Sequence, residues 1–273
     1  MRCFFYAHSM PFTTVISPLG QPLHLDAAKA HLRVDGTDDD DNIKALIASA
    51  TQAAEAKTHH QLLHARFTHT QDCFTRSIRL PHAPVVNVVS VQYLGMDGLV
   101  DTVDPADYIV NYGTPATITP VFGTVWPVTM PQDASVFVTY EAGYASPVTA
   151  TATTGNLTVN GPYAYAVGQR VTFSNSGGAL PAPLDADTPY LIATVVGNTY
   201  TLTDTAGNPI TFTTAGTGRN FIGEVPAPIK SWMLLRIGSL FESREETAPS
   251  ARTTIEFMPF VDGLLAPYLM VEY

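Results

Sequence analysis

Four histidines lie close together in the sequence and are the first candidates for metal chemistry. A zinc site needs three or four ligands that converge, often histidine nitrogens joined by a carboxylate or a thiolate. The candidates are His59, His60, His64 and His69. His60 and His64 share a face only if a helix runs through both, whereas residues 67–74 alternate like a strand. We therefore favour surface or interface roles for these histidines over a metal site.

Four consecutive aspartates, residues 38–41, form a second candidate metal site. A calcium loop of the EF-hand type would also need a glycine and a distal glutamate at fixed offsets. The aspartates directly precede a repeat of apolar residues with helical spacing, and the positive end of a helix dipole favours negative charge at that position. We interpret them as the start of a helix.

Glu141 and Asp107 are candidates for the carboxylate pair of an acid–base enzyme, such as a cell-wall glycan hydrolase. Nothing in the sequence fixes the distance between them, and a surface or strand-edge position is favoured for both. The sequence also lacks a P-loop, a Gly-x-Ser-x-Gly elbow and a His-Glu-x-x-His motif. We expect no enzyme activity, no catalytic residues, no bound metal and no cofactor.

The composition argues against several further classes of function. The net charge is −10 and the pI is near 5.1, which argues against a surface that coats nucleic acid. No apolar run approaches the length of about 20 residues that spans a bilayer, so we expect no membrane partner. The two cysteines, Cys3 and Cys73, are too few for a disulfide framework and are expected to be free thiols.

A long amphipathic segment near the end of the chain, residues 225–246, is expected to be the central helix of the fold. Prolines mark its start, and Pro249 follows its last turn. Its large apolar side chains recur at helical spacing and are the predicted core of the helix: Ile229, Trp232, Met233, Ile237, Leu240 and Phe241. Their burial requires a partner, which we expect far upstream.

The upstream elements are predicted from the same periodicities. Residues 25–34 indicate a short helix capped by Asp26, and a second helix of about 20 residues follows the acidic run. Residues 66–143 alternate in short runs separated by turns and predict one small antiparallel sheet. The predicted strands are 67–75, 77–80, 86–94, 99–103, 108–111, 117–120 and 134–140.

Residues 146–222 differ sharply in composition from the rest of the chain. They contain no Lys, Glu, His, Cys, Met or Trp, and Gly and Asn turns separate threonine-rich alternating runs. The predicted strands are 157–159, 170–173, 190–196, 199–204 and 210–213. We expect an all-β barrel or sandwich, residues 146–222, inserted into an α+β domain formed by 1–145 and 223–273.

The C-terminal segment, residues 257–273, is more apolar than a free terminus. Methionine and aromatic anchors are typical of interface cores, so we expect part of it to contact a neighbouring subunit or another protein. Folding back onto its own subunit is the alternative, with comparable support for Phe260, Leu264 and Leu265 and less for residues 269–273. The candidate interface residues are Phe260, Leu264, Leu265, Tyr268, Leu269, Met270 and Tyr273.

Several sequence blocks, taken in order, resemble the small head-tail connectors (head-completion adaptors) of tailed bacteriophages. Each block alone is weak, but together they cover nearly all of 23–145 and 223–268. The blocks are residues 25–35, the acidic start and 47–51 of the second helix, 122–127, 138–144, 225–230, 241–245 and 264–268. The insert is not part of that pattern and is similar to β modules appended to phage virion proteins.

The resemblance implies a structural protein of the virion neck, assembled in the host cytoplasm. Such connectors form a ring, typically of twelve subunits, between the portal protein and a stopper or tail-terminator protein. DNA passes through the lumen without specific binding, a duty that suits an acidic chain. The alternative is a binding module in which the insert contacts capsid protein or carbohydrate through its tyrosines: Tyr163, Tyr165, Tyr190 and Tyr200.

Overall fold

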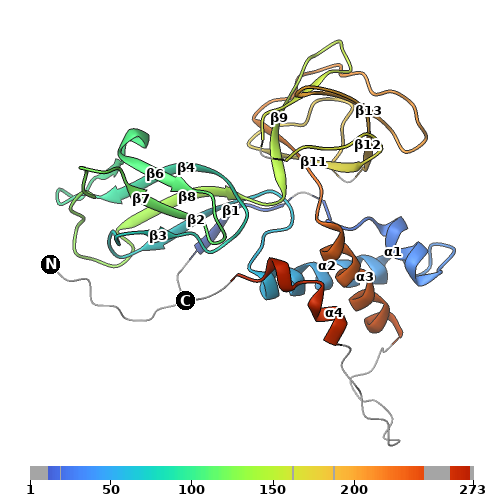
Figure 1. Ribbon diagram of the computed structural model, residues 1–273, viewed down its shortest axis with the longest axis horizontal. Coiled ribbons are helices and arrows are strands. Elements are labelled where there is room, and N and C mark those ends of the chain that lie inside the picture. Colours follow the sequence, from blue (N-terminus) through green and yellow to red (C-terminus); the bar gives the residue numbers. More distant parts are fainter. Residues whose placement is uncertain (1–11, 19, 162, 187, 243–258, 271–273) are drawn as a thin grey trace, which may run out of the picture.

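The computed structural model describes residues 12–18, 20–161, 163–186, 188–242 and 259–270. They form three lobes that meet at a common junction, which we call the sheet lobe, the barrel and the helical lobe (Figure 1). The chain passes from the sheet lobe to the first helices, returns to the sheets, builds the barrel and ends in the last helices. The predicted α+β architecture with an additional all-β module is confirmed.

The sheet lobe contains two antiparallel sheets, where the sequence predicted one. The five-stranded sheet has the order β1-β2-β8-β4-β5, and the three-stranded sheet has the order β3-β7-β6. The first comprises β1 (Phe12–Ile16), β2 (Ala65–Gln71), β8 (Val136–Ala142), β4 (Val85–Leu94) and β5 (Val100–Thr102). The second comprises β3 (Ile78–Arg79), β7 (Thr117–Pro120) and β6 (Tyr108–Asn111), which the short 3₁₀ helix η1 (Pro105–Asp107) precedes. Side chains such as Ile78, Ile118 and Val138 bury their apolar area in one shared core.

The barrel is closed and antiparallel, with the order β10-β13-β12-β11-β14-β9. Its strands are β9 (Ala145–Ala150), β10 (Leu157–Val159), β11 (Arg170–Ser176), β12 (Tyr190–Val196), β13 (Thr199–Thr203) and β14 (Arg219–Gly223). The strand predicted at 210–213 is absent from the described residues, and only a bridge between Thr203 and Pro209 forms there. β9 and β14 were not predicted, yet they close the barrel around a core of its own.

The helical lobe joins segments from both ends of the chain. Its elements are α1 (Leu25–Leu32), α2 (Asp40–Thr58), α3 (Ala227–Glu242), α4 (Pro259–Gly263) and η2 (Ala266–Tyr268). α1 and α2 pack against α3, so the late helix finds its partner upstream as predicted. Helix α1 begins at Leu25 with His24 as its N-cap, so the predicted cap at Asp26 is wrong. Asp26 lies in the first turn, where the helix dipole still favours its charge.

Cys73 is disulfide-bonded, so the expectation of a free thiol is wrong for this residue, because separation in sequence does not limit proximity in the fold. Cys3 lies outside the described residues. Among the described helices, none combines the length and the apolar character needed to cross a membrane.

Candidate interfaces and the junction of the lobes

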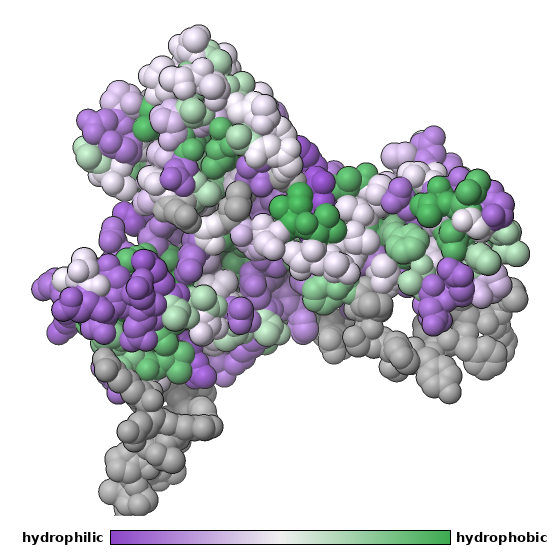
Figure 2. All heavy atoms as spheres, turned by 180° about the vertical axis from the view of Figure 1, so that it is seen from behind, coloured by the Kyte–Doolittle hydropathy of each residue, from purple (hydrophilic) through white to green (hydrophobic). Residues whose placement is uncertain are grey.

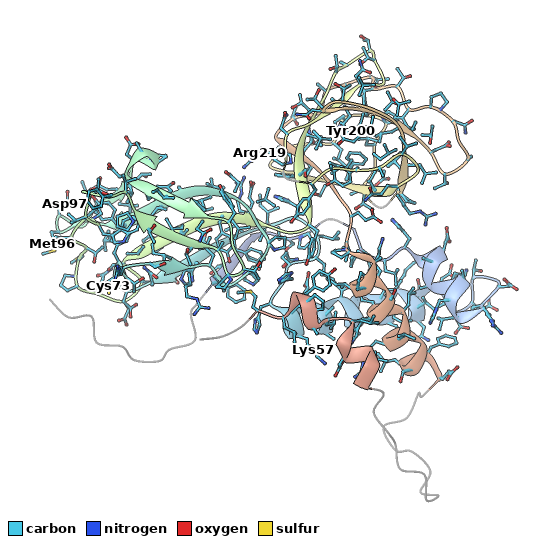
Figure 3. All side chains as sticks on the ribbon, viewed as in Figure 1. Lys57, Cys73, Met96, Asp97, Tyr200 and Arg219 are labelled. Atoms are coloured by element: carbon cyan, nitrogen blue, oxygen red, sulfur yellow. The ribbon has the colours of Figure 1, made fainter. Side chains whose placement is uncertain are left out.

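Glu141 lies at the junction between the sheet lobe and the barrel. It belongs to β8, in the middle of the five-stranded sheet, and its side chain is fully buried. Arg66 Nη2 of β2 donates to Oε1 at 2.8 Å, and Arg219 of β14 donates to Oε2. Figure 3 shows Arg219 at the edge of the barrel that faces the sheet lobe. One carboxylate therefore joins two strands of different lobes.

The surroundings of Glu141 keep it ionised. Burial works to raise the pKa of Glu141, but His64, Arg66 and Arg219 lower it to about 2. His64 Nε2 is 3.8 Å from Oε1, too long for a strong hydrogen bond, so the two arginines supply most of the stabilisation. The ring of His64 instead stacks on Phe221 of the barrel, with centroids 3.6 Å apart.

The strand-to-strand connection beside this ion pair leaves no room for a side chain. Gly143 joins β8 to β9 with φ +135°, and a Cβ at this position would lie 2.6 Å from the carbonyl oxygen of Leu63. A second carboxylate, Glu224, follows β14 and accepts hydrogen bonds from Gln169 of the barrel and from Lys230 of α3. The barrel is thus held to both other lobes by buried or half-buried polar contacts.

This geometry does not form an acid–base pair. Glu141 is enclosed by two arginines, which hold it as an anion and occupy both oxygens. Asp107 lies in the exposed η1 turn, where its backbone carbonyl accepts a hydrogen bond from Val121. The favoured surface or strand-edge position is therefore correct for Asp107 and wrong for Glu141, because β8 is a central strand.

Of the four clustered histidines, His59 is exposed, in agreement with the expected surface position, and the other three lie in the interior. His60, His64 and His69 are buried, so surface positions were the wrong expectation for these three. Burial first, and then the charge of His59, lowers the pKa of His60 to about 4, and its Nδ1 pairs with the Tyr144 hydroxyl. Within the described part of the chain, no three His, Cys, Asp or Glu side chains gather as metal ligands.

The residues predicted as the core of the late helix lie in α3. Ile229, Trp232, Met233 and Ile237 are buried, while Leu240 and Phe241 are half-buried. Trp232 Nε1 donates to Asp262 Oδ1 of α4 at 3.3 Å, and Lys57 of α2 pairs with the same oxygen at 2.6 Å. Figure 3 shows Lys57 beside α4. These contacts fasten α4 to the helical lobe.

The candidate interface residues of the C-terminal segment separate into inner and outer ones. Leu265 is buried, and Leu264 and Tyr268 pack against the same helical core. Leu269 is 42% exposed, and Met270 N donates to the carbonyl of Thr58 at 3.4 Å. Phe260 lies in α4, and Tyr273 lies outside the described residues. The outer residues, Leu269 and Met270, therefore stay the candidates for contact with a neighbour.

The first two helices of the helical lobe and part of the sheet lobe match a family model. Residues 23–93 match the model of the phage gp6-like head-tail connector proteins. The predicted resemblance is confirmed over this segment. It spans α1, α2, β2, β3 and almost all of β4, so the connector signature covers both the helices and the sheet that they adjoin. No curated protein matches the chain.

Solved structures extend the likeness to almost the whole chain. A chain in the neck of an empty gene transfer agent (GTA) particle, computed with C6 symmetry, is 16% identical with a TM-score of 0.57. Chains from the virion of a native GTA particle and from a native GTA neck computed with C12 symmetry give TM-scores of 0.55 and 0.54, at 16% and 15% identity. Each match covers 97% of both chains, so the three-lobe fold, barrel included, is shared.

Sequence reasoning missed an exposed apolar region at the outer end of the sheet lobe. Apolar side chains lie there beside polar ones (Figure 2). They come from the β4–β5 hairpin and the β7–β8 loop: Met96, Leu99, Val100, Phe122, Val125 and Val128. The available signal was the apolar residues that flank turn glycines, as in Leu99 after Gly98 and Phe122 before Gly123. Such positions are normally polar when a loop only faces water.

Proposed function

We propose that the protein is a structural head-tail connector that forms a ring in the neck of a virion or a virion-like particle. The observation that carries this proposal is the match of residues 23–93 to the connector family. The full-length likeness to chains of GTA particle necks supports it, because the barrel is included in that likeness. A purely structural role also agrees with the enclosed, salt-bridged state of Glu141.

The number and arrangement of subunits are part of this proposal. Closed rings arise when one surface of a subunit binds a different surface of the next, so a ring of identical subunits needs two such patches on each copy. The GTA necks were computed with C6 and C12 symmetry, which supports a ring and agrees with the twelve subunits that the sequence resemblance implies. The ring would lie between the portal protein and a stopper or tail-terminator protein.

The charge of the chain suits passage of DNA without specific binding. The net charge is −10, and DNA carries a phosphate charge for about every 1.7 Å of its axis, so a lumen lined by carboxylates would repel it. Repulsion lowers the affinity for a polymer that has to move through the ring.

Removal of the chain from assembling particles tests the proposed function. We expect filled heads and finished tails that fail to join, visible by electron microscopy as separate populations. Supply of the wild-type chain to purified heads should then restore joined particles. Normal yields of tailed particles without the chain would contradict a connector role.

A further inference from the structure

The outer end of the sheet lobe exposes more large apolar area than a solvent-facing loop requires. Phe122 is fully exposed, Val125 is 89% exposed and Val128 is 75% exposed. Met96 and Leu99, in the hairpin, are each 65% exposed. We call Met96, Leu99, Val100, Phe122, Val125 and Val128 the outer apolar surface. Figure 3 labels Met96 at this end of the sheet lobe. A patch of this kind marks a protein interface more often than it marks a neutral surface.

The loop that carries this surface is held in place by its neighbours. Met130 N donates to the carbonyl of Leu94 at 2.9 Å, which fastens the end of the loop to the base of the hairpin. Trp126 stacks on Phe74 with centroids 4.7 Å apart and ring planes 8° from parallel. Thr124 Oγ1 donates to the carbonyl of Val121 at 2.7 Å. Binding through a fixed loop loses little conformational entropy.

Acidic side chains outnumber basic ones around the outer apolar surface, where the exposed Arg76 lies two residues from Phe74, the stacking partner of Trp126. Residues 80–169 contain no Lys or Arg. Five exposed aspartates lie in the same part of the sheet lobe: Asp97, Asp101, Asp104, Asp107 and Asp133. Because interfaces pair opposite potentials, a partner should present Lys or Arg around an apolar recess. Contact with another acidic surface would be repulsive.

A second copy of this chain fits that description poorly. Six of the eleven Lys and Arg side chains that the structure describes are paired with carboxylates of their own chain. These are Lys29, Lys44, Lys57, Arg66, Arg219 and Lys230. Exposed arginines remain at positions 33, 76, 170 and 236, but a whole copy carries a net charge of −10, so on balance it would be repelled by an acidic rim.

We propose that the outer apolar surface binds a different protein of the neck, one whose apolar recess is rimmed by Lys and Arg. The inference rests on the proposed connector function, because it assumes that the chain is assembled in a neck. The proposed contact is distinct from the contacts between copies within the ring. Phe122 and Val125, the most exposed anchors, would enter the recess and the aspartates would pair with its rim.

Site-specific photo-cross-linking in assembled particles tests the proposal. A benzoylphenylalanine in place of Phe122 should cross-link to a protein other than this chain, at a segment containing Lys or Arg. The same probe in place of Val167, which is 65% exposed on the barrel, is the matched control and should not label that segment. Cross-links to another copy, to residues 1–11 or 243–258 of the same chain, or to nothing would overturn the proposal.

The presence of the chain in purified particles distinguishes a failure of this proposal from a failure of the connector function on which it rests. If the wild-type chain is missing from purified particles before irradiation, the connector function fails and the inference fails with it. If the chain is present but Phe122 labels only copies of itself, the connector function stands and the inference alone is wrong.

Substitution gives a second measurement with the purified protein that cross-linking identifies. Changing Phe122→Ser together with Val125→Ser should weaken its binding at least tenfold, because both side chains are anchors. Val167→Ser together with Val196→Ser removes similarly exposed side chains from the barrel and should leave binding unchanged. Circular dichroism checks that both variants are folded. Equal affinities of the two folded variants would contradict the proposal.

Discussion

At the scale of single residues, Glu141 is the side chain on which the junction of the lobes depends most. Its two oxygens are held by arginines of different lobes, and burial leaves it no water as a substitute partner. Removing the charge leaves Arg66 and Arg219 facing each other without a counter-ion. Removing one partner of a buried ion pair lowers the free energy of unfolding more than removing one partner of an exposed ion pair.

Glu141→Gln should therefore lower the free energy of unfolding by about 2 kcal/mol at neutral pH. The ordinary glutamate pKa of 4.5 is lowered to about 2 in the fold, so the ionised form stabilises the protein fully above pH 4.5. This contribution is lost as the pH falls from 4.5 through 2. Urea denaturation across that range should show the difference between wild type and variant shrinking.

Glu242→Gln is the matched control, because Glu242 is exposed at the end of α3. Its unfolding free energy should stay within the small range of ordinary surface substitutions. A Glu141 variant that behaves like this control at every pH would show that the ion pair does not hold the junction.

At the scale of elements, α3 connects the two ends of the chain. Trp232 is only 5% exposed and reaches α4 through its indole nitrogen. Trp232→Ala should cost about 3–5 kcal/mol of stability through lost burial and a residual cavity. Leu235→Ala, on the same helix but at a 40% exposed position, should cost less than about 1 kcal/mol. Equal shifts in a denaturant titration would place Trp232 outside the core.

We expect the last residues of the C-terminal segment to contribute to assembly into particles and not to folding of the subunit. Residues 264, 265 and 268 pack on the helical lobe, whereas Leu269 is 42% exposed. Deleting 269–273 should leave the fold unchanged by circular dichroism and lower incorporation into particles. Wild-type incorporation of the shortened chain would remove this segment from the candidate interfaces.

The elements differ in how far the sequence determines them. Strong local patterns predicted β6, β7, β10 and β12 with the bounds that the structure has. β9 was missed because Pro147 weakens its strand pattern, and β14 was missed because it follows a glycine-rich turn. Both strands form through pairing with each other across the barrel closure. The pairing of Glu141 with Arg219, 78 residues away, likewise has no local signal.

Considering the whole molecule, we expect the sheet lobe and the helical lobe to fold without the barrel. Its core is its own, and its ends are adjacent, because Ala145 pairs with Gly223. Replacing 147–222 with a short Gly-Ser linker should leave a soluble, folded protein. Stability should fall, because Glu141 loses Arg219 and His64 loses its stacking on Phe221. Loss of the helical circular dichroism signal would show that the division at 146–222 is wrong.

We propose that this chain forms a ring in a particle neck. Cryo-electron microscopy of particles assembled with the chain tests it most directly, with the neck reconstructed first without imposed symmetry. We predict twelve copies of the three-lobe fold in one ring beside the portal, with the outer apolar surface covered by a second protein. A neck that lacks this fold, or density for it elsewhere on the particle, would contradict the claim.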